Sequence, residues 1–222
     1  MVINAEQQRA LLYQTGLEML NLCKSQLEKS AEALKNQDSE LAEEIIHKES
    51  RVNALDLKIE RDCEKFLALY NPVATDLRFI MAMRKINLDL ERIGDLAYEI
   101  ANYVVDEEDK IPESLFKALS FDVLHETITS MLENIAIAYE EKDVKIARKV
   151  FKKDKILDKT NRNSFDVLEK EIKKDDSIIK QALLLFVVVK KLERVGDLIK
   201  NISEEIIFYI DAEVLKHKKK KK

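Results

Sequence analysis

Apolar residues recur every three or four positions along most of the chain, a spacing that places them on one face of an α-helix. Between residues 7 and 34, for example, this face comprises Leu11, Leu12, Leu17, Leu20, Cys23, Leu27, Ala31 and Leu34. Short polar breaks divide the pattern and predict six helices, at about residues 7–34, 39–69, 72–105, 114–140, 143–173 and 178–215.

The ends of these helices carry residues that helix ends favour. Asp38 or Ser39 can cap the second helix, and Asp175–Ser177 can cap the sixth. Pro72 suits the first position of the third helix, where its missing N–H costs no hydrogen bond. Because short links between long amphipathic helices make antiparallel neighbours, the fold is predicted to be all-α, with two tandem up-down-up three-helix bundles.

The two predicted bundles are residues 1–108 and 109–217, and a lysine tail at 218–222 is expected to be disordered. An acidic break at 106–109 separates them. The composition supports long helices, because the 222 residues include three glycines and two prolines.

Charge and cysteine content exclude several classes of protein. The net charge of −4 includes five lysines at 218–222, so the rest of the chain carries −9, which argues against nucleic-acid binding. The tail itself is interpreted as solubilising, with contact to an anionic membrane surface as the alternative. The longest apolar run, Ala182–Val189, is too short to span a bilayer. Cys23 and Cys63 lack the spacing of a disulfide framework and no leader precedes them, which predicts reduced cysteines in a cytoplasmic protein.

A six-residue pattern occurs twice, 102 positions apart, as Glu91–Leu96 and Glu193–Leu198. Each copy places two carboxylates at positions i and i+4 of a helix, with a glycine directly before the second. Like charges at this spacing cost about 0.2–0.5 kcal/mol, and a mid-helix glycine costs about 1 kcal/mol relative to alanine. Because both costs occur twice, we take divalent-metal binding as the first hypothesis.

A metal at either copy needs further oxygen ligands, because two carboxylates supply too few for a hard cation or for iron. The preceding helix of the second half supplies Asp154 and Asp158, again four residues apart. The corresponding positions of the first half are Glu49 and Asn53, at an offset of 105 rather than 102. In antiparallel pairs these residues can lie opposite the hexapeptides, which predicts two clusters and makes the second more complete.

Two alternatives remain open on these residues. The arginine of each hexapeptide stands three positions before its aspartate, so the motif can instead be a surface ion pair beside a glycine that lets helices pack closely. Glu44-Ile-Ile-His47 has the form found in di-iron carboxylate enzymes, but such enzymes use two copies, and His47 is expected on the surface. The sequence shows no glycine-rich phosphate loop and no dinucleotide fingerprint.

The segment Asn71–Arg78, Asn-Pro-Val-Ala-Thr-Asp-Leu-Arg, followed by the two hexapeptides, resembles the signature of the PhoU family of phosphate-uptake regulators. The resemblance covers nearly the whole chain and includes its length and its duplicated halves. Members of that family bind multinuclear metal clusters through Glu/Asp-x-x-x-Asp motifs on the bundle surface. The resemblance therefore implies metal ligands at Glu49, Glu91 and Asp95 in the first half and at Asp154, Asp158, Glu193 and Asp197 in the second.

Two departures from the family pattern modify this expectation. Asn53 stands where a second acid is expected, so the first site should be weaker or contain fewer metal ions. The second half lacks the Pro-Val-Ala-Thr-Asp-Leu-Arg block. Oxygen-rich sites accept several metals, and iron or zinc is expected first, with magnesium, manganese and calcium as alternatives.

The function implied by the resemblance is non-enzymatic. The protein is expected to be a cytoplasmic, homodimeric negative regulator of phosphate uptake and phosphate-starvation signalling. It would dock between a phosphate ABC transporter and a sensor histidine kinase, in peripheral contact with these membrane complexes. Two other hypotheses stay open. The protein could be a carboxylate-bridged di-metal enzyme on a helical bundle, or it could be a structural dimerisation module without metal.

Overall fold

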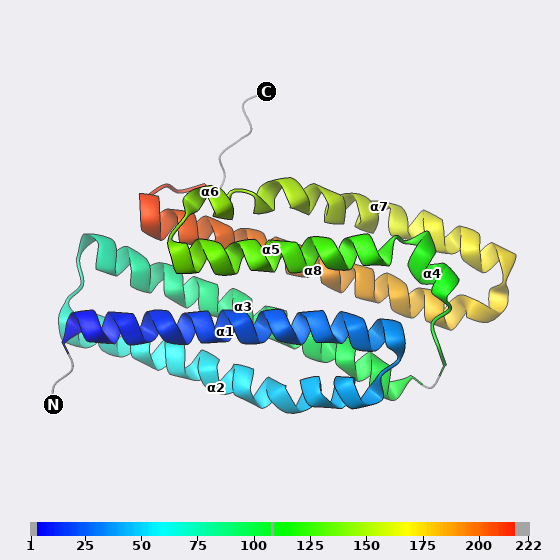
Figure 1. Ribbon diagram of the computed structural model, residues 1–222, viewed down its shortest axis with the longest axis horizontal. Coiled ribbons are helices and arrows are strands. Elements are labelled where there is room, and N and C mark those ends of the chain that lie inside the picture. The colour runs from blue at the N-terminus through cyan, green and yellow to red at the C-terminus, as the bar shows by residue number, and fades with distance from the viewer. Residues whose placement is uncertain (1–3, 108, 216–222) are drawn as a thin grey trace, which may run out of the picture.

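The computed structural model describes residues 4–107 and 109–215, and the predicted lysine tail at 218–222 lies outside this range. All regular structure in the described part is helical. The helices are α1 (Ala5–Asn36), α2 (Ser39–Tyr70), α3 (Ala74–Asp106), α4 (Glu113–Ala118), α5 (Phe121–Glu141), α6 (Val144–Ala147), α7 (Val150–Lys174) and α8 (Ile179–Asp211), with a 3-10 turn at Asp176–Ile178 (Figure 1).

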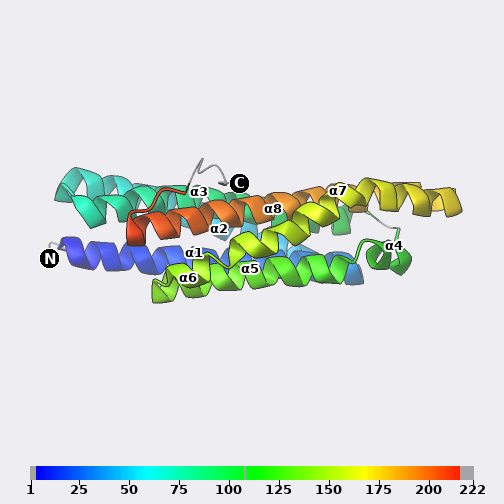
Figure 2. The ribbon, with the colours of Figure 1, turned by 90° about the horizontal axis from the view of Figure 1, so that it is seen from above.

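The prediction of an all-α fold with a duplicated helix triplet is confirmed. Helices α1, α2 and α3 form one antiparallel triplet, and α5, α7 and α8 form the other (Figure 1). The triplets are not separate bundles in space, because α3 packs along α8 and α1 packs along α5. Helices α2 and α7 lie on the outer sides, and the molecule is an elongated, flattened slab (Figure 2). A continuous set of buried apolar side chains therefore runs through both halves.

Several predicted helix ends agree with the structure. Asp38 caps α2 by accepting a hydrogen bond from the Leu41 N–H at 2.9 Å. Asp175 accepts from the Ser177 N–H at 3.0 Å and starts the turn that leads into α8. Pro72 is not the first residue of α3, which begins two residues later at Ala74. Asn71 ends α2 in a left-handed conformation, with φ of 46°, and Val73 is extended, so residues 71–73 form a short non-helical link.

Two predicted helices of the second half are each broken in the structure. The break at Leu119–Ser120 gives Ser120 a φ of 52° and separates α4 from α5. It lets the Phe116 and Phe121 rings, both buried, pack edge-to-face at 5.0 Å. A tertiary contact, rather than a local breaker residue, therefore accompanies the turn.

The second break follows α6 at Arg148–Lys149. Ser203 on α8 donates its hydroxyl to the Ala147 carbonyl at 2.8 Å. That carbonyl sits in the last turn of α6, and the contact anchors the end of this short helix to α8. The predicted continuous helix at 143–173 is interrupted at this point.

Other expectations concern burial and membrane contact. Cys23 and Cys63 are buried free thiols, as predicted. Across the described residues, no helix combines the length and apolarity that crossing a bilayer requires.

An ion pair ties the two halves together where α3 meets α8. The Lys85 ammonium donates to both carboxylate oxygens of Glu205, at 2.9 and 3.1 Å. Glu205 is 4% exposed, so its charge has little contact with water. Removing a cation from a buried carboxylate costs more than the pair itself contributes, so loss of Lys85 should be felt at Glu205.

We predict that Lys85→Met lowers the free energy of unfolding by about 2 kcal/mol, which corresponds to roughly 4–8 °C in Tm for a chain of this size. Methionine keeps the apolar stem, so the loss reports the charge. The control is Lys117→Met, which removes an exposed pair with Glu113 and should cost less than about 0.5 kcal/mol. Calorimetry measures both, and equal small losses would contradict the prediction.

Candidate metal-binding clusters

The hexapeptides lie on α3 and α8, the two helices that pack together at the centre of the molecule. Their acids flank the buried face of each helix rather than belong to it. On α3, for example, the buried face consists of Leu90, Ile93, Ala97 and Ile100, each fully buried. The paired acids Glu91 and Asp95 are half-buried beside this face.

The glycine of each hexapeptide allows a neighbouring helix to approach closely. A methyl group at Gly94 would stand 2.8 Å from Val52 Cγ1 on α2. A methyl group at Gly196 would overlap Leu157 Cδ1 on α7. The expectation that these glycines permit close helix packing is therefore confirmed, and the approach brings acids of adjacent helices toward one another.

The first cluster, which we define as Glu49, Asp56, Glu91 and Asp95, joins α2 to α3. Burial, followed by the charges of Asp95 and Asp56, raises the pKa of Glu91. Burial, followed by the charge of Glu49, raises the pKa of Asp95. The carboxyl groups of Glu91 and Asp95 stand four residues apart on one helix, and each disfavours the charged form of its neighbours.

Asp56 was not among the predicted ligands, although it faces the same group of acids. Burial raises its pKa, with the charges of Glu60 and Asp95 adding to the effect, and Asn87 donates to its carboxylate at 2.6 Å. At the 105-residue offset Asp56 corresponds to Asn161, and Asn53 corresponds to Asp158. The acid and the amide have exchanged places between the halves. The spacing of Asp56 seven residues after Glu49, on one helix face, was the available signal.

The second cluster, Asp154, Asp158, Glu193 and Asp197, joins α7 to α8 and contains a cation of its own. Lys200 Nζ lies 2.7 Å from Asp154 Oδ2 and 2.7 Å from Asp197 Oδ1. Burial alone would lower the pKa of Lys200, but the hydrogen bonds to Asp154 and Asp197 outweigh it and raise the pKa. At the 102-residue offset, the first half has Tyr98 in place of this lysine.

One carboxylate oxygen of the second cluster remains unused. Asp154 is 7% exposed, and its Oδ1 atom is buried without a hydrogen-bond partner among the described residues. Burial also raises the pKa of Glu193, with the charges of Asp197 and Asp158 adding to the effect. The cluster therefore has spare acceptor capacity even with Lys200 bound.

The alternative of an arginine–aspartate pair inside each hexapeptide does not describe the contacts observed. Arg92 instead lies 3.7 Å from Asp89, and Lys200 contacts Asp197. His47 is exposed, as expected.

The fit of these residues to a metal differs between the clusters. As the side chains stand, the described residues contain no group of three or more acids, histidines or cysteines arranged to hold a metal ion. The donors of the first cluster are all carboxyl oxygens whose mutual repulsion a cation would relieve, which fits a hard metal. In the second cluster a lysine already provides that relief. Metal binding at Glu49, Glu91, Asp95, Asp154, Asp158, Glu193 and Asp197 stays a prediction, and the first cluster now fits better than the sequence indicated.

Comparison with known proteins finds the model of the PhoU domain family matching residues 17–104 and again residues 121–206. The chain is 33% identical over 201 residues to the phosphate-specific transport system accessory protein PhoU homolog of Aquifex aeolicus, covering 90% of each protein. It is 28% identical over 201 residues to the phosphate-specific transport system accessory protein PhoU of Escherichia coli K12, covering 90% of this chain and 83% of that protein.

Solved structures give the same result. The crystal structure of PhoU from Pseudomonas aeruginosa superposes with a TM-score of 0.87 at 25% identity, covering 95% of this chain and 100% of that one. The phosphate transport system regulatory protein PhoU from Streptococcus pneumoniae gives a TM-score of 0.81 at 26% identity, covering 96% and 99%.

We predict that Glu91→Gln stabilises the chelator-treated protein at pH 7.5 by roughly 0.5 kcal/mol, or about 1–2 °C in Tm. Because the native pKa of Glu91 lies above its ordinary value of 4.5, folding binds a proton there. The stability from that proton is full below pH 4.5 and is lost as the pH rises through the native pKa. The glutamine acts like the protonated acid, so its advantage should vanish toward pH 4.5. Glu126→Gln, at an exposed acid of α5, is the control; an advantage that does not change with pH would contradict the prediction.

Proposed function

Because this chain belongs to the PhoU family, we propose that it is an accessory protein of a phosphate transport system that restrains phosphate uptake and phosphate-starvation signalling. The observation that carries the proposal is that both halves match the PhoU domain. Relatives named as phosphate-specific transport system accessory proteins align with 90% of the chain. These names describe accessory proteins and support a regulatory rather than a catalytic role.

The finer proposal is that the protein works as an adaptor between a phosphate ABC transporter and a sensor histidine kinase. Helices of 32 and 33 residues in α1, α2 and α3 present extended faces, and such faces suit docking without a catalytic cleft. The protein would reach both partners from the cytoplasmic side as a homodimer, in peripheral contact with the membrane complexes.

We further propose that the first cluster binds metal. Glu49, Asp56, Glu91 and Asp95 would hold the ion through carboxylate oxygens. When bound, the ion supplies positive charge that neutralises these acids and links α2 to α3. Membership of the family puts iron or zinc first, whereas the all-carboxylate donor set by itself favours magnesium, manganese or calcium.

The second cluster is expected to bind metal more weakly, because an ion there competes with the Lys200 ammonium for Asp154 and Asp197. Because Lys200 is part of the chain, its effective concentration beside these acids is high, and a metal ion from solution must compete with it. Asp154 Oδ1 remains available to an ion that displaces it.

The alternative of a carboxylate-bridged di-metal enzyme has no observation in its favour. Such an enzyme places its acids inside the bundle, whereas Glu91 and Asp95 are half-buried beside the buried face of α3.

A metal-content measurement tests the proposed sites. Glu91→Ala/Asp95→Ala should lose most of the bound metal after purification and reloading, and Lys200→Met should gain metal relative to wild type. The matched control is Glu126→Ala/Glu133→Ala, which removes two exposed acids of α5. Elemental analysis of all four proteins gives the answer, and equal metal in all of them would overturn the site assignment.

The regulatory role is tested in a bacterium whose own PhoU gene has been deleted. Expression of this chain should restore repression of a phosphate-starvation reporter in high phosphate and reduce phosphate uptake. The Glu126→Ala/Glu133→Ala variant should do the same. A folded, well-expressed chain that leaves both readouts derepressed would contradict the regulatory proposal.

A further inference from the structure

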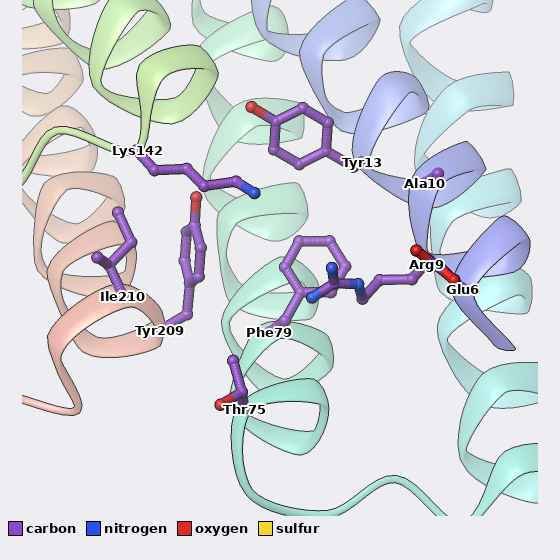
Figure 3. A pocket seen from close by; sticks show the side chains of 9 residues that line it. All are labelled: Glu6, Arg9, Ala10, Tyr13, Thr75, Phe79, Lys142, Tyr209 and Ile210. Atoms are coloured by element: carbon purple, nitrogen blue, oxygen red, sulfur yellow. The ribbon is translucent and has the colours of Figure 1, made fainter.

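A cavity of about 370 Å³ lies at the end of the molecule where α1 and α3 begin and where α5 and α8 end (Figure 1). Its walls come from both halves of the chain, as the close view in Figure 3 shows. The volume is at the lower end of the range for small-molecule sites, roughly 300–1,000 Å³. None of its lining residues belongs to either acid cluster.

Tyr209 lines this cavity and carries a buried hydroxyl. Tyr209 is 5% exposed, and its hydroxyl has no hydrogen-bond partner among the described residues. The ring is fixed edge-to-face against Phe79 at 5.7 Å, so the hydroxyl cannot easily turn away. Burial, followed by the charge of Tyr13, raises the pKa of Tyr209, so the hydroxyl remains a donor at neutral pH. An unsatisfied buried hydroxyl costs about 1–3 kcal/mol, which a bound acceptor would recover.

Two cations reach the cavity from opposite halves. Arg9 on α1 lies 3.3 Å from Asp76 through Nη1. Lys142 follows α5 in a left-handed conformation, with φ of 55°. In Figure 3 the Lys142 ammonium and the Tyr209 hydroxyl point toward the same part of the cavity. Arginine and lysine side chains with a hydroxyl donor are suited to binding a phosphate group.

The position of Lys142 is held by contacts between the halves. The Tyr13 hydroxyl donates to the Tyr139 carbonyl at 2.6 Å and to the Glu140 carbonyl at 3.0 Å. The Tyr13 and Tyr139 rings stack at 4.6 Å, and Lys142 Nζ lies 5.6 Å from the centre of the Tyr13 ring. The ammonium thus lies over an aromatic ring that belongs to the other half.

The other residues that line the cavity suit a ligand that is larger and less polar than a simple anion. Tyr13, Phe79 and Tyr209 make one side aromatic, and the volume exceeds that of inorganic phosphate several times. Glu6 adds a carboxylate, which repels an anion but accepts hydrogen bonds from hydroxyl or amino groups. A ligand that satisfies all of these groups has a phosphate, an apolar planar part and hydrogen-bond donors.

We infer that this cavity binds a nucleoside monophosphate or a phosphate monoester of similar size and chemistry. Its phosphate contacts Arg9 and Lys142, and it reaches the buried Tyr209 hydroxyl when the bound ligand uncovers it. Its ring packs against the aromatic side, and its donors face Glu6. The inference is independent of metal binding and of phosphate regulation, because it rests on other residues.

Calorimetric titration of the full chain with AMP, adenosine and inorganic phosphate tests the inference. AMP should bind saturably, and adenosine and inorganic phosphate should each bind at least about tenfold more weakly. Arg9→Ala and Lys142→Ala should each weaken AMP by about tenfold or more, because each removes a charged hydrogen bond. Lys145→Ala, at an exposed lysine of α6 outside the cavity, is the matched control and should bind as wild type.

Tyr209→Phe provides the sharpest variant, because it removes the hydroxyl and keeps the ring. It should raise the Tm of the ligand-free protein and weaken AMP by several-fold, so reduced binding cannot be attributed to misfolding. The inference is overturned by no saturable AMP binding at millimolar concentration, or by equal affinities in wild type and the three cavity variants. If inorganic phosphate bound as tightly as AMP, the proposed packing of the ligand ring against the aromatic side would be wrong. If adenosine bound as tightly as AMP, the proposed contacts of the phosphate with the two cations would be wrong.

Discussion

The close approach of α2 to α3, and of α7 to α8, is the constraint on which the fold and its chemistry depend. Gly94 and Gly196 make it possible, because any side chain there would meet Val52 or Leu157. Helices that pack this tightly bury their apolar faces well, but they also bring the acids beside those faces together. Favourable packing and unfavourable charge are therefore consequences of the same two glycines.

The two halves resolve this conflict in different ways. In the first half, burial and the neighbouring acids raise the pKa of Glu91 and of Asp95. In the second half the Lys200 ammonium lies between Asp154 and Asp197. The same motif on the same backbone therefore has a different electrostatic environment in each half. Since one residue, Tyr98 against Lys200, makes much of the difference, a family motif alone does not establish a metal site.

Much of the fold was predictable because it follows from local pattern. The ends of α1, α2, α3 and α8 lie within about four residues of the prediction, since apolar periodicity and caps such as Asp38 mark them. The breaks before α5 and after α6 were not predictable, because packing of Phe121 and the Ser203 hydroxyl bond accompany them. The site was partly predictable. Spacing found the acids on each helix, but the role of Lys200 required knowing which side chains meet across the helix pair.

The Lys85–Glu205 pair has a consequence for how duplicated chains avoid assembling wrongly. Because α3 and α8 are related by duplication, α3 of one chain could pack against α3 of another, as in a domain-swapped assembly. At the 102-residue offset Glu205 corresponds to Tyr103 and Lys85 to Val187. Pairing α3 with α3 would separate Lys85 from Glu205, and pairing α8 with α8 would place Glu205 away from Lys85. The ion pair therefore favours the contact between α3 and α8 over contacts between two copies of the same helix, which adds to specificity against self-pairing.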